Sequence, residues 1–109
     1  MNIEKTKAQM RKGVLEYCIL SIINEKEVYA SDIIQKLKEA KLIVVEGTLY
    51  PLLTRLKNDV LLSYRWEESK SGPPRKYYEI TESGINFLKD LDRGWNELVE
   101  AVNKIAGKG

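Results

Sequence analysis

The side chains best suited to chemistry lie in residues 48–58, where polar and apolar positions recur with helical spacing. At 100° per residue, the leucines of this segment fall on one face and the polar residues on the other. The polar face carries Tyr50, Pro51, Thr54, Arg55, Lys57 and Asn58. Cationic side chains bind phosphate, and short hydrogen-bonding groups contact the edges of bases. The segment is therefore a candidate nucleic-acid-contacting helix.

Residues for catalysis are scarce. The sequence contains no histidine and a single cysteine, Cys18, which lies in the apolar run VLEYCILSII. A lone cysteine forms neither an internal disulfide nor a metal site, so Cys18 is predicted to be a small buried hydrophobic residue. No nucleophile–base pair or phosphate-binding glycine motif is present. We expect no enzyme activity, no metal and no cofactor.

The composition is that of one soluble globular unit of 109 residues, 43% hydrophobic and 31% charged. Its formal net charge of +2 does not by itself indicate a nucleic-acid partner. The N-terminus MNIEKTKAQMRKG is polar and does not resemble a signal peptide, and the longest apolar run is too short for a bilayer. These features predict a cytoplasmic protein without membrane contact.

Three helices are predicted before the middle of the chain. The first spans about residues 6–24, and the second runs from an N-cap at Ser31 to about residue 40. The third begins at Gly47 or Thr48, which places Pro51 in its first turn or just past it. There a proline is tolerated because the backbone N–H groups lack helical partners.

A β-hairpin is predicted next. In LLSYRWEE and in RKYYEIT, apolar and polar residues alternate with a period of two. The segment SKSGPP between them contains glycine and proline, which are typical of turns. Basic residues lie at its tip and base, namely Lys70, Arg75 and Lys76.

A long last helix is predicted from Thr81 or Ser83 to about residue 106. Its apolar residues are spaced alternately by three and four, which is a heptad pattern over about two and a half repeats. They are Leu88, Leu91, Trp95, Leu98, Val102 and Ile105. Gly94 interrupts the pattern. Such an apolar seam predicts a partner helix and therefore a homodimer.

Three helices followed by a hairpin is the order of a winged helix-turn-helix. The predicted fold class is mainly α with a β-hairpin wing and a long C-terminal dimerisation helix. Residues 1–81 are expected to form the DNA-binding domain and residues 82–109 the dimerisation helix. In this arrangement the third helix enters the major groove and the wing reaches adjacent phosphates.

Four segments together resemble the PadR-type transcriptional regulators. They are MRKGVLEYCILSII, VYASDIIQKL, EGTLYPLLTRL and SGPPRKYYEIT, and the resemblance covers about residues 9–88. The single C-terminal helix is similar to that of the small PadR subgroup. The resemblance implies a homodimer that represses promoters from a palindromic operator and releases the DNA when a ligand or stress signal arrives.

Carried over by position, the resemblance assigns Thr48, Tyr50, Pro51, Thr54 and Arg55 to the recognition helix, and Lys70, Arg75 and Lys76 to the wing. Tyr29, and Arg11 or Lys12, are further candidates for phosphate contact. Two positions depart from the family pattern. Family members usually carry glycine where Val60 stands, so Asn58 or Asp59 is expected to supply any left-handed residue there. Ser31 replaces a family tyrosine near the start of the second helix.

Trp95 lies in the middle of the apolar seam, so in a two-fold dimer it is expected near its symmetry mate. The resemblance implies that paired tryptophans in this region sandwich flat aromatic ligands. Val14, Tyr17 and Leu91 are expected to complete such a pocket. The alternative is that Trp95 only packs the dimer interface, and the sequence leaves both readings open.

Two other functions compete with DNA regulation. The first is a winged-helix module that binds protein, which the small net charge leaves open. It predicts no salt-dependent DNA affinity. The second is a dimeric small-molecule-binding protein built around Trp95 without regulation, which leaves the polar face of the third helix without a role.

Overall fold

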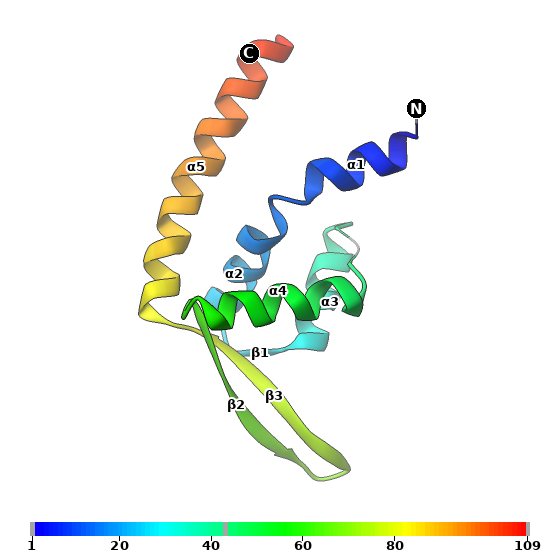
Figure 1. The fold of residues 1–109 in the computed structure, drawn as a ribbon, viewed down its shortest axis with the longest axis vertical. Helices are drawn as coiled ribbons and strands as arrows, with labels where there is room; N and C mark the ends of the chain where they lie inside the picture. The colour runs from blue at the N-terminus through cyan, green and yellow to red at the C-terminus, as the bar shows by residue number, and fades with distance from the viewer. Residues whose placement is uncertain (1, 43, 109) are drawn as a thin grey trace.

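The computed structural model describes residues 2–42 and 44–108. The elements in order are α1 (Ile3–Arg11), α2 (Leu15–Glu25), β1 (Val28–Tyr29), α3 (Ala30–Glu39), α4 (Glu46–Asn58), β2 (Leu62–Ser69), β3 (Gly72–Ile80) and α5 (Glu82–Ala106). Helices α2, α3 and α4 form a head, the β2–β3 hairpin extends from it in one direction, and α1 and α5 extend in the other (Figure 1). The predicted fold class, mainly α with a β-hairpin wing and a long C-terminal helix, is confirmed.

One hydrophobic core lies inside the head, between its helices and the sheet. Helix α4 contributes Leu49, Leu53 and Leu56, all essentially inaccessible to solvent, as the leucine face predicted. The other fully buried large side chains come from α2, α3 and β2, and they are Ile19, Leu20, Ile23, Ile33, Leu37 and Leu62. Because the leucines of α4 are buried, its polar residues must face outward.

The sheet has three antiparallel strands in the order β1-β3-β2. The two-residue strand β1 was not predicted; it pairs Val28 with Tyr78 and Tyr29 with Tyr77. The prolines Pro73 and Pro74 were expected in the turn but lie within β3, and the turn is formed by residues 70–71. Proline is tolerated there because β1 pairs with β3 at residues 77 and 78, so near the tip β3 has a neighbour on one side only.

The predicted first helix is in fact two helices. α1 ends at Arg11 and α2 begins at Leu15, with Gly13 between them. Glycine costs about 1 kcal/mol relative to alanine inside a helix. α1 buries none of its residues, whereas α2 buries Ile19, Leu20 and Ile23. Tertiary packing therefore does not hold the two segments in one straight helix.

Two other helix starts differ from the prediction. α3 begins at Ala30, and its N-cap is Tyr29 rather than Ser31; the Asp32 carboxylate accepts a hydrogen bond of 3.0 Å from the Tyr29 backbone N–H. α4 begins at Glu46, which makes Pro51 its sixth residue. Pro51 is thus beyond the first turn, and its missing N–H removes one hydrogen bond from the helix.

The left-handed residue after α4 is Val60 itself, with φ 63°, whereas Asp59 has φ −83°. The expectation that Asn58 or Asp59 takes this conformation was wrong. The Val60 carbonyl accepts a hydrogen bond of 2.6 Å from the Thr81 hydroxyl, which itself accepts one of 2.9 Å from the Gly84 N–H. Thr81 is therefore the N-cap of α5, and it ties the end of α4 to the start of α5.

Candidate nucleic-acid interface

The polar face of α4 is exposed along its whole length. Thr48, Tyr50, Pro51, Thr54 and Arg55 are all exposed. With 100° per residue, Pro51 and Thr54 lie outermost, Tyr50 lies at one edge and Thr48 and Arg55 lie at the other. The recognition residues implied by the resemblance thus form one surface with two edges, and the two edges face different parts of the molecule.

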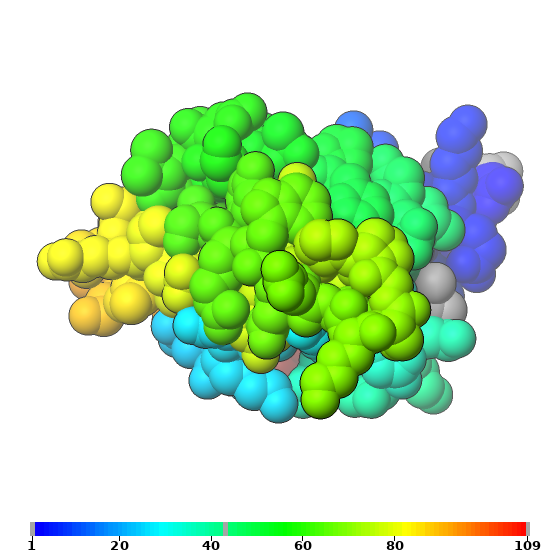
Figure 2. Space-filling model, turned by 90° about the horizontal axis from the view of Figure 1, so that it is seen from below, coloured from blue at the N-terminus to red at the C-terminus, as the bar shows by residue number. Residues whose placement is uncertain are grey.

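The Tyr50 edge faces the β2–β3 hairpin across a groove of about 420 Å³. The groove is lined by residues of α3, α4, β2 and β3, including Ser31, Glu46, Tyr50, Trp66, Arg75 and Lys76. From below, the hairpin projects toward the viewer, with α4 on one side and the cyan segment of β1 and α3 on the other (Figure 2). Tyr50 therefore shares one concave surface with Arg75 and Lys76, two of the three cations of the predicted wing.

Lys76 is the central cation of this surface. Its ammonium nitrogen lies 4.4 Å from the ring centroid of Tyr64 and 5.5 Å from that of Trp66. The Lys57 ammonium of α4 lies over the same Tyr64 ring, at 5.8 Å. A smaller hollow of about 120 Å³ continues the surface between α4 and the sheet, and it includes Thr54, Lys57 and Lys76. Aromatic faces thus hold two lysines beside the polar face of α4.

The other edge of α4 faces the N-terminal helices. Arg55 forms an ion pair with Glu16 of α2, so its guanidinium is engaged within the chain. Thr48 and Arg11 line a separate groove of about 350 Å³ between α1 and the start of α4. Thr48, Arg11 and Arg55 are therefore not brought together with Tyr50, Arg75 and Lys76.

The wing residues divide between the tip and the two faces of the hairpin. Lys70 lies in the turn and is exposed. Lys76 lies on the face with Tyr64 and Tyr78, whereas Arg75 alternates to the other face. The Arg75 guanidinium carbon lies 4.5 Å from the ring centroid of Tyr29, and its nitrogen donates to the Ser31 hydroxyl at 3.5 Å. Tyr29 is therefore a platform for Arg75.

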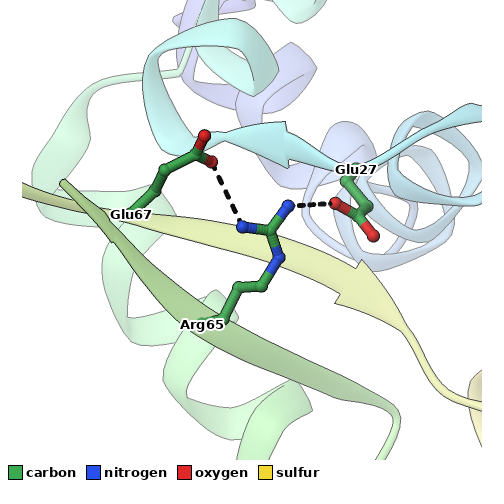
Figure 3. Close-up of polar contacts among 3 residues, drawn as sticks. All are labelled: Glu27, Arg65 and Glu67. Carbon is green, nitrogen blue, oxygen red and sulfur yellow. Dashed lines mark hydrogen bonds and ion pairs between the residues drawn. The ribbon is translucent and has the colours of Figure 1, made fainter. Parts of the chain in front are cut away.

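Arg65 was not among the predicted site residues. Its guanidinium donates to Glu27 at 2.7 Å and to Glu67 at 3.3 Å (Figure 3). The same group lies 4.7 Å from the ring centroid of Tyr77. Through its hydrogen bond, the Arg65 guanidinium holds the pKa of the Glu27 carboxyl below its usual range. The alternation of β2 predicts that Arg65 and Glu67 lie on one face of the strand. Glu27, however, directly precedes β1, the strand that the sequence did not predict.

The apolar seam of α5 is only partly available to a partner. Leu88 is 6% exposed and belongs to the core of the head, and Leu91 is half-buried against that core. Leu88 was expected at the dimer interface, but a side chain already buried within its own chain offers almost no surface to a partner. Beyond Leu91 the seam is uncovered, with Trp95, Leu98, Val102 and Ile105 all exposed.

Two of the four expected ligand-pocket residues lie in direct contact. The ring centroids of Tyr17, in α2, and Trp95, in α5, are 6.2 Å apart with an interplanar angle of 38°. The Tyr17 hydroxyl donates a hydrogen bond to Asp92, and this bond raises the pKa of the Tyr17 phenol above its usual value. Val14 and Leu91 are both half-buried, and Leu91 packs against the core.

Comparison with known proteins places the chain in a family. The family model of the PadR-like transcriptional regulators matches residues 19–90. A PadR-like transcription factor structure from Bacteroides fragilis is 66% identical, covers 93% of this chain and 98% of its own, and has a TM-score of 0.79. A PadR-like transcriptional regulator from Bacillus cereus is 40% identical, with coverages of 90% and 96% and a TM-score of 0.79.

One similar structure contains nucleic acid. It is Bacillus subtilis PadR in complex with operator DNA, 27% identical, with a TM-score of 0.67; the match covers 72% of this chain and 46% of that one. Among the described residues, no helix is both long and apolar enough to cross a membrane. These matches agree with the fold and with the sequence motifs of α4 and the hairpin, since all of them indicate the same family. The chain belongs to the PadR-like family and is a transcriptional regulator rather than an enzyme.

Proposed function

We propose that the chain binds operator DNA as a homodimer, with α4 in the major groove and the β2–β3 hairpin on the adjacent backbone. The observation that carries this proposal is the shared surface of Tyr50, Thr54, Lys57 and Lys76, which combines hydrogen-bonding groups with cations. A major groove about 12 Å wide admits one helix. The family likeness supports the proposal, since a PadR relative is solved with operator DNA.

The two kinds of side chain have different roles in this proposal. Lys57, Lys70, Arg75 and Lys76 neutralise phosphates, which sets the register and the salt dependence of binding. Tyr50, Thr54 and Pro51 contact base edges and thymine methyl groups. Arg55 reaches DNA only when phosphate competes successfully with Glu16, its partner in the free chain. Three further residues flank this central surface and are proposed to contact the phosphates of the DNA backbone. They are Arg11, Tyr29 and Thr48.

The homodimer part of the proposal rests on α5. This helix has 25 residues, and its distal half exposes Trp95, Leu98, Val102 and Ile105 on one side. An apolar stripe with heptad spacing is stabilised when a second helix covers it. A second copy of α5 supplies a matching stripe through two-fold symmetry. Two recognition helices then face two half-sites of a palindrome.

The signal-sensing part of the proposal rests on the contact between Tyr17 and Trp95. A flat aromatic effector would stack on Trp95 in the dimer and contact Tyr17 and Val14. Since Tyr17 belongs to the head and Trp95 to the long helix, such a ligand would bias the angle between them. We propose that this change releases the operator, which makes the chain a ligand-responsive repressor.

Footprinting on DNA upstream of the chain's own gene tests the DNA-binding part. We expect two protected half-sites with centres about 10 bp apart. Lys76→Ala should weaken binding across sequences and reduce the salt slope, by about 0.9 if Lys76 contacts one phosphate. Lys89→Ala removes an exposed lysine of α5 and is the matched control. A protein-binding module would give no footprint and no effect of either substitution.

Fluorescence with a panel of planar dyes tests the sensing part. The chain has two tryptophans, so the wild type is compared with Trp95→Leu, which keeps Trp66. Quenching in the wild type that is lost in Trp95→Leu supports the ligand site. If no dye quenches the fluorescence and calorimetry detects no heat of binding, Trp95 is not a ligand site and only packs the dimer interface.

A further inference from the structure

Arg75 of the wing has a carboxylate directly across the hairpin. In the β2–β3 register, Glu67 is the residue opposite Arg75. Residues opposed in this way have Cβ atoms about 5 Å apart, and opposite charges at such positions attract each other. Glu67 is therefore the natural ion-pair partner of Arg75, and an Arg75 engaged by Glu67 is less available to a DNA phosphate.

The structure pairs Glu67 with a different arginine. The Arg65 guanidinium donates to Glu67 at 3.3 Å and to Glu27 at 2.7 Å, so one cation bridges two carboxylates (Figure 3). Arg75, by contrast, stacks on Tyr29 and donates to Ser31, both at the start of α3. Among the ion pairs of residues 2–42 and 44–108, Glu67 is joined to Arg65 and not to Arg75.

Two tyrosines keep these arginines apart. Tyr29 and Tyr77 pair across β1 and β3, and their rings meet edge to face with centroids 4.6 Å apart. Arg65 lies over the Tyr77 ring and Arg75 lies over the Tyr29 ring. Each guanidinium thus has its own aromatic platform, and Arg75 also lines the groove that contains Tyr50 and Lys76.

We propose that Arg65 is a positioning residue for DNA binding: it holds the Glu67 carboxylate and thereby leaves Arg75 free to bind a phosphate. This inference rests on the proposed DNA-binding function. Arg65 itself contributes no phosphate contact, because its guanidinium already lies between the carboxylates of Glu27 and Glu67, whose negative charges repel phosphate. The effect of Arg65 on DNA affinity therefore depends on whether residue 67 carries a negative charge.

Four variants, measured by DNA binding over a range of salt concentrations, separate this role from the alternatives. Arg65→Met should lower the affinity about as much as Arg75→Ala, and lower the slope of log K against log salt by about 0.9. The double variant Arg65→Met with Glu67→Gln should recover both the affinity and the slope of the wild type. Glu67→Gln alone should bind at least as tightly as the wild type.

Two results would overturn the proposal. If Arg65 bound phosphate directly, the double variant would keep the reduced slope. If Arg65 only stabilised the hairpin, Arg65→Met would lower the melting temperature and Glu67→Gln would not rescue binding.

A measurement without DNA keeps failure of this inference distinct from failure of the proposed function. The Arg75 guanidinium lies over the Tyr29 ring, so protons at the end of this side chain should show upfield NMR shifts. Arg65→Met should change these shifts, and the double variant should restore them. Loss of both the rescue and the shift change refutes the positioning role. If the wild type binds no operator DNA but Arg65→Met still changes the shifts, the proposed function is refuted. The cluster of Arg65, Glu67 and Arg75 then has no role in DNA binding.

Discussion

The hydroxyl of Tyr17 donates a hydrogen bond to the carboxylate of Asp92, and this bond joins α2 to α5 three residues before Trp95. The ring of Tyr17 also packs against that of Trp95. The long helix is therefore fixed to the head next to the point where its apolar seam becomes exposed. A change at Trp95 can reach the head through this contact.

Asp92→Asn should lower the pKa of the Tyr17 phenol toward its ordinary value. The carboxylate accepts the phenol proton in a hydrogen bond and opposes the charge of the phenolate, so it favours the protonated form. Because the pKa of Tyr17 is higher in the folded state than in the unfolded state, this hydrogen bond stabilises the fold fully below the unfolded-state pKa. That stabilisation is lost as the pH rises through the folded-state pKa. NMR titration of the tyrosine rings measures the shift. Asp90→Asn, at an exposed site paired with Arg93, is the control, and an equal shift in both variants would contradict this assignment.

Gly84→Ala should destabilise the fold by about 1–3 kcal/mol, as overpacking of a close contact does. A Cβ at position 84 would lie 2.1 Å from the Leu61 carbonyl oxygen and 2.7 Å from the Ile80 side chain. The backbone oxygen cannot rotate away, so α5 would have to move from the head. Gly94→Ala on the same helix meets no atom within 4 Å and should instead stabilise by about 0.5–1 kcal/mol. Chemical denaturation at one protein concentration compares them; equal stabilities would rule out the close approach.

Val60→Gly should increase the free energy of unfolding by about 1 kcal/mol. Val60 has φ 63°, a conformation that costs an L-residue about 1–2 kcal/mol, and its side chain is 63% exposed, so little packing is lost. Glycine relieves this strain but loses more backbone entropy on folding. Thermal unfolding of the wild type and of Val60→Gly measures the difference, and a loss of stability in the variant would contradict the strain.

Leu98→Glu should convert the proposed dimer into monomers. Leu98 is 54% exposed on the distal seam, and a carboxylate there would face its symmetry mate in an apolar interface. Asn96→Glu adds the same charge to an exposed position about 160° around the helix from Leu98 and should leave the dimer intact. Light scattering after size-exclusion chromatography gives the mass of each variant. A wild type that is monomeric at micromolar concentration would refute the α5 interface.

Local patterns in the sequence predict most of the fold. The leucine face of α4 and the alternation in β2 and β3 are direct consequences of helical and extended periodicity. β1 is too short to show a period, and it exists because Tyr29 pairs with Tyr77 of a distant strand. Val60 takes the left-handed position because the junction with Thr81 fixes the chain there, and no propensity indicates that.

The candidate site was less predictable than the fold. A stripe of apolar residues looks the same whether its own chain or a partner covers it, so Leu88 could not be distinguished from Leu98. An exposed arginine on a helix gives no sign of its partner, and the pairing of Arg55 with Glu16 depends on how α2 packs near α4. Arg65 was missed for the same reason. Its contact with Glu67, two residues along β2, is local, but its contact with Glu27 and its proposed effect on Arg75 are tertiary.

Operator affinity as a function of salt, measured together with stoichiometry, tests the central claim most directly. The chain is titrated onto a duplex that carries its upstream half-sites and onto a scrambled duplex of equal length. We predict two chains per operator, an affinity at least about 10³-fold higher than for the scrambled duplex, and a steep linear fall of log K with log salt. Equal affinity for the two duplexes, or no binding at low salt, would contradict the account.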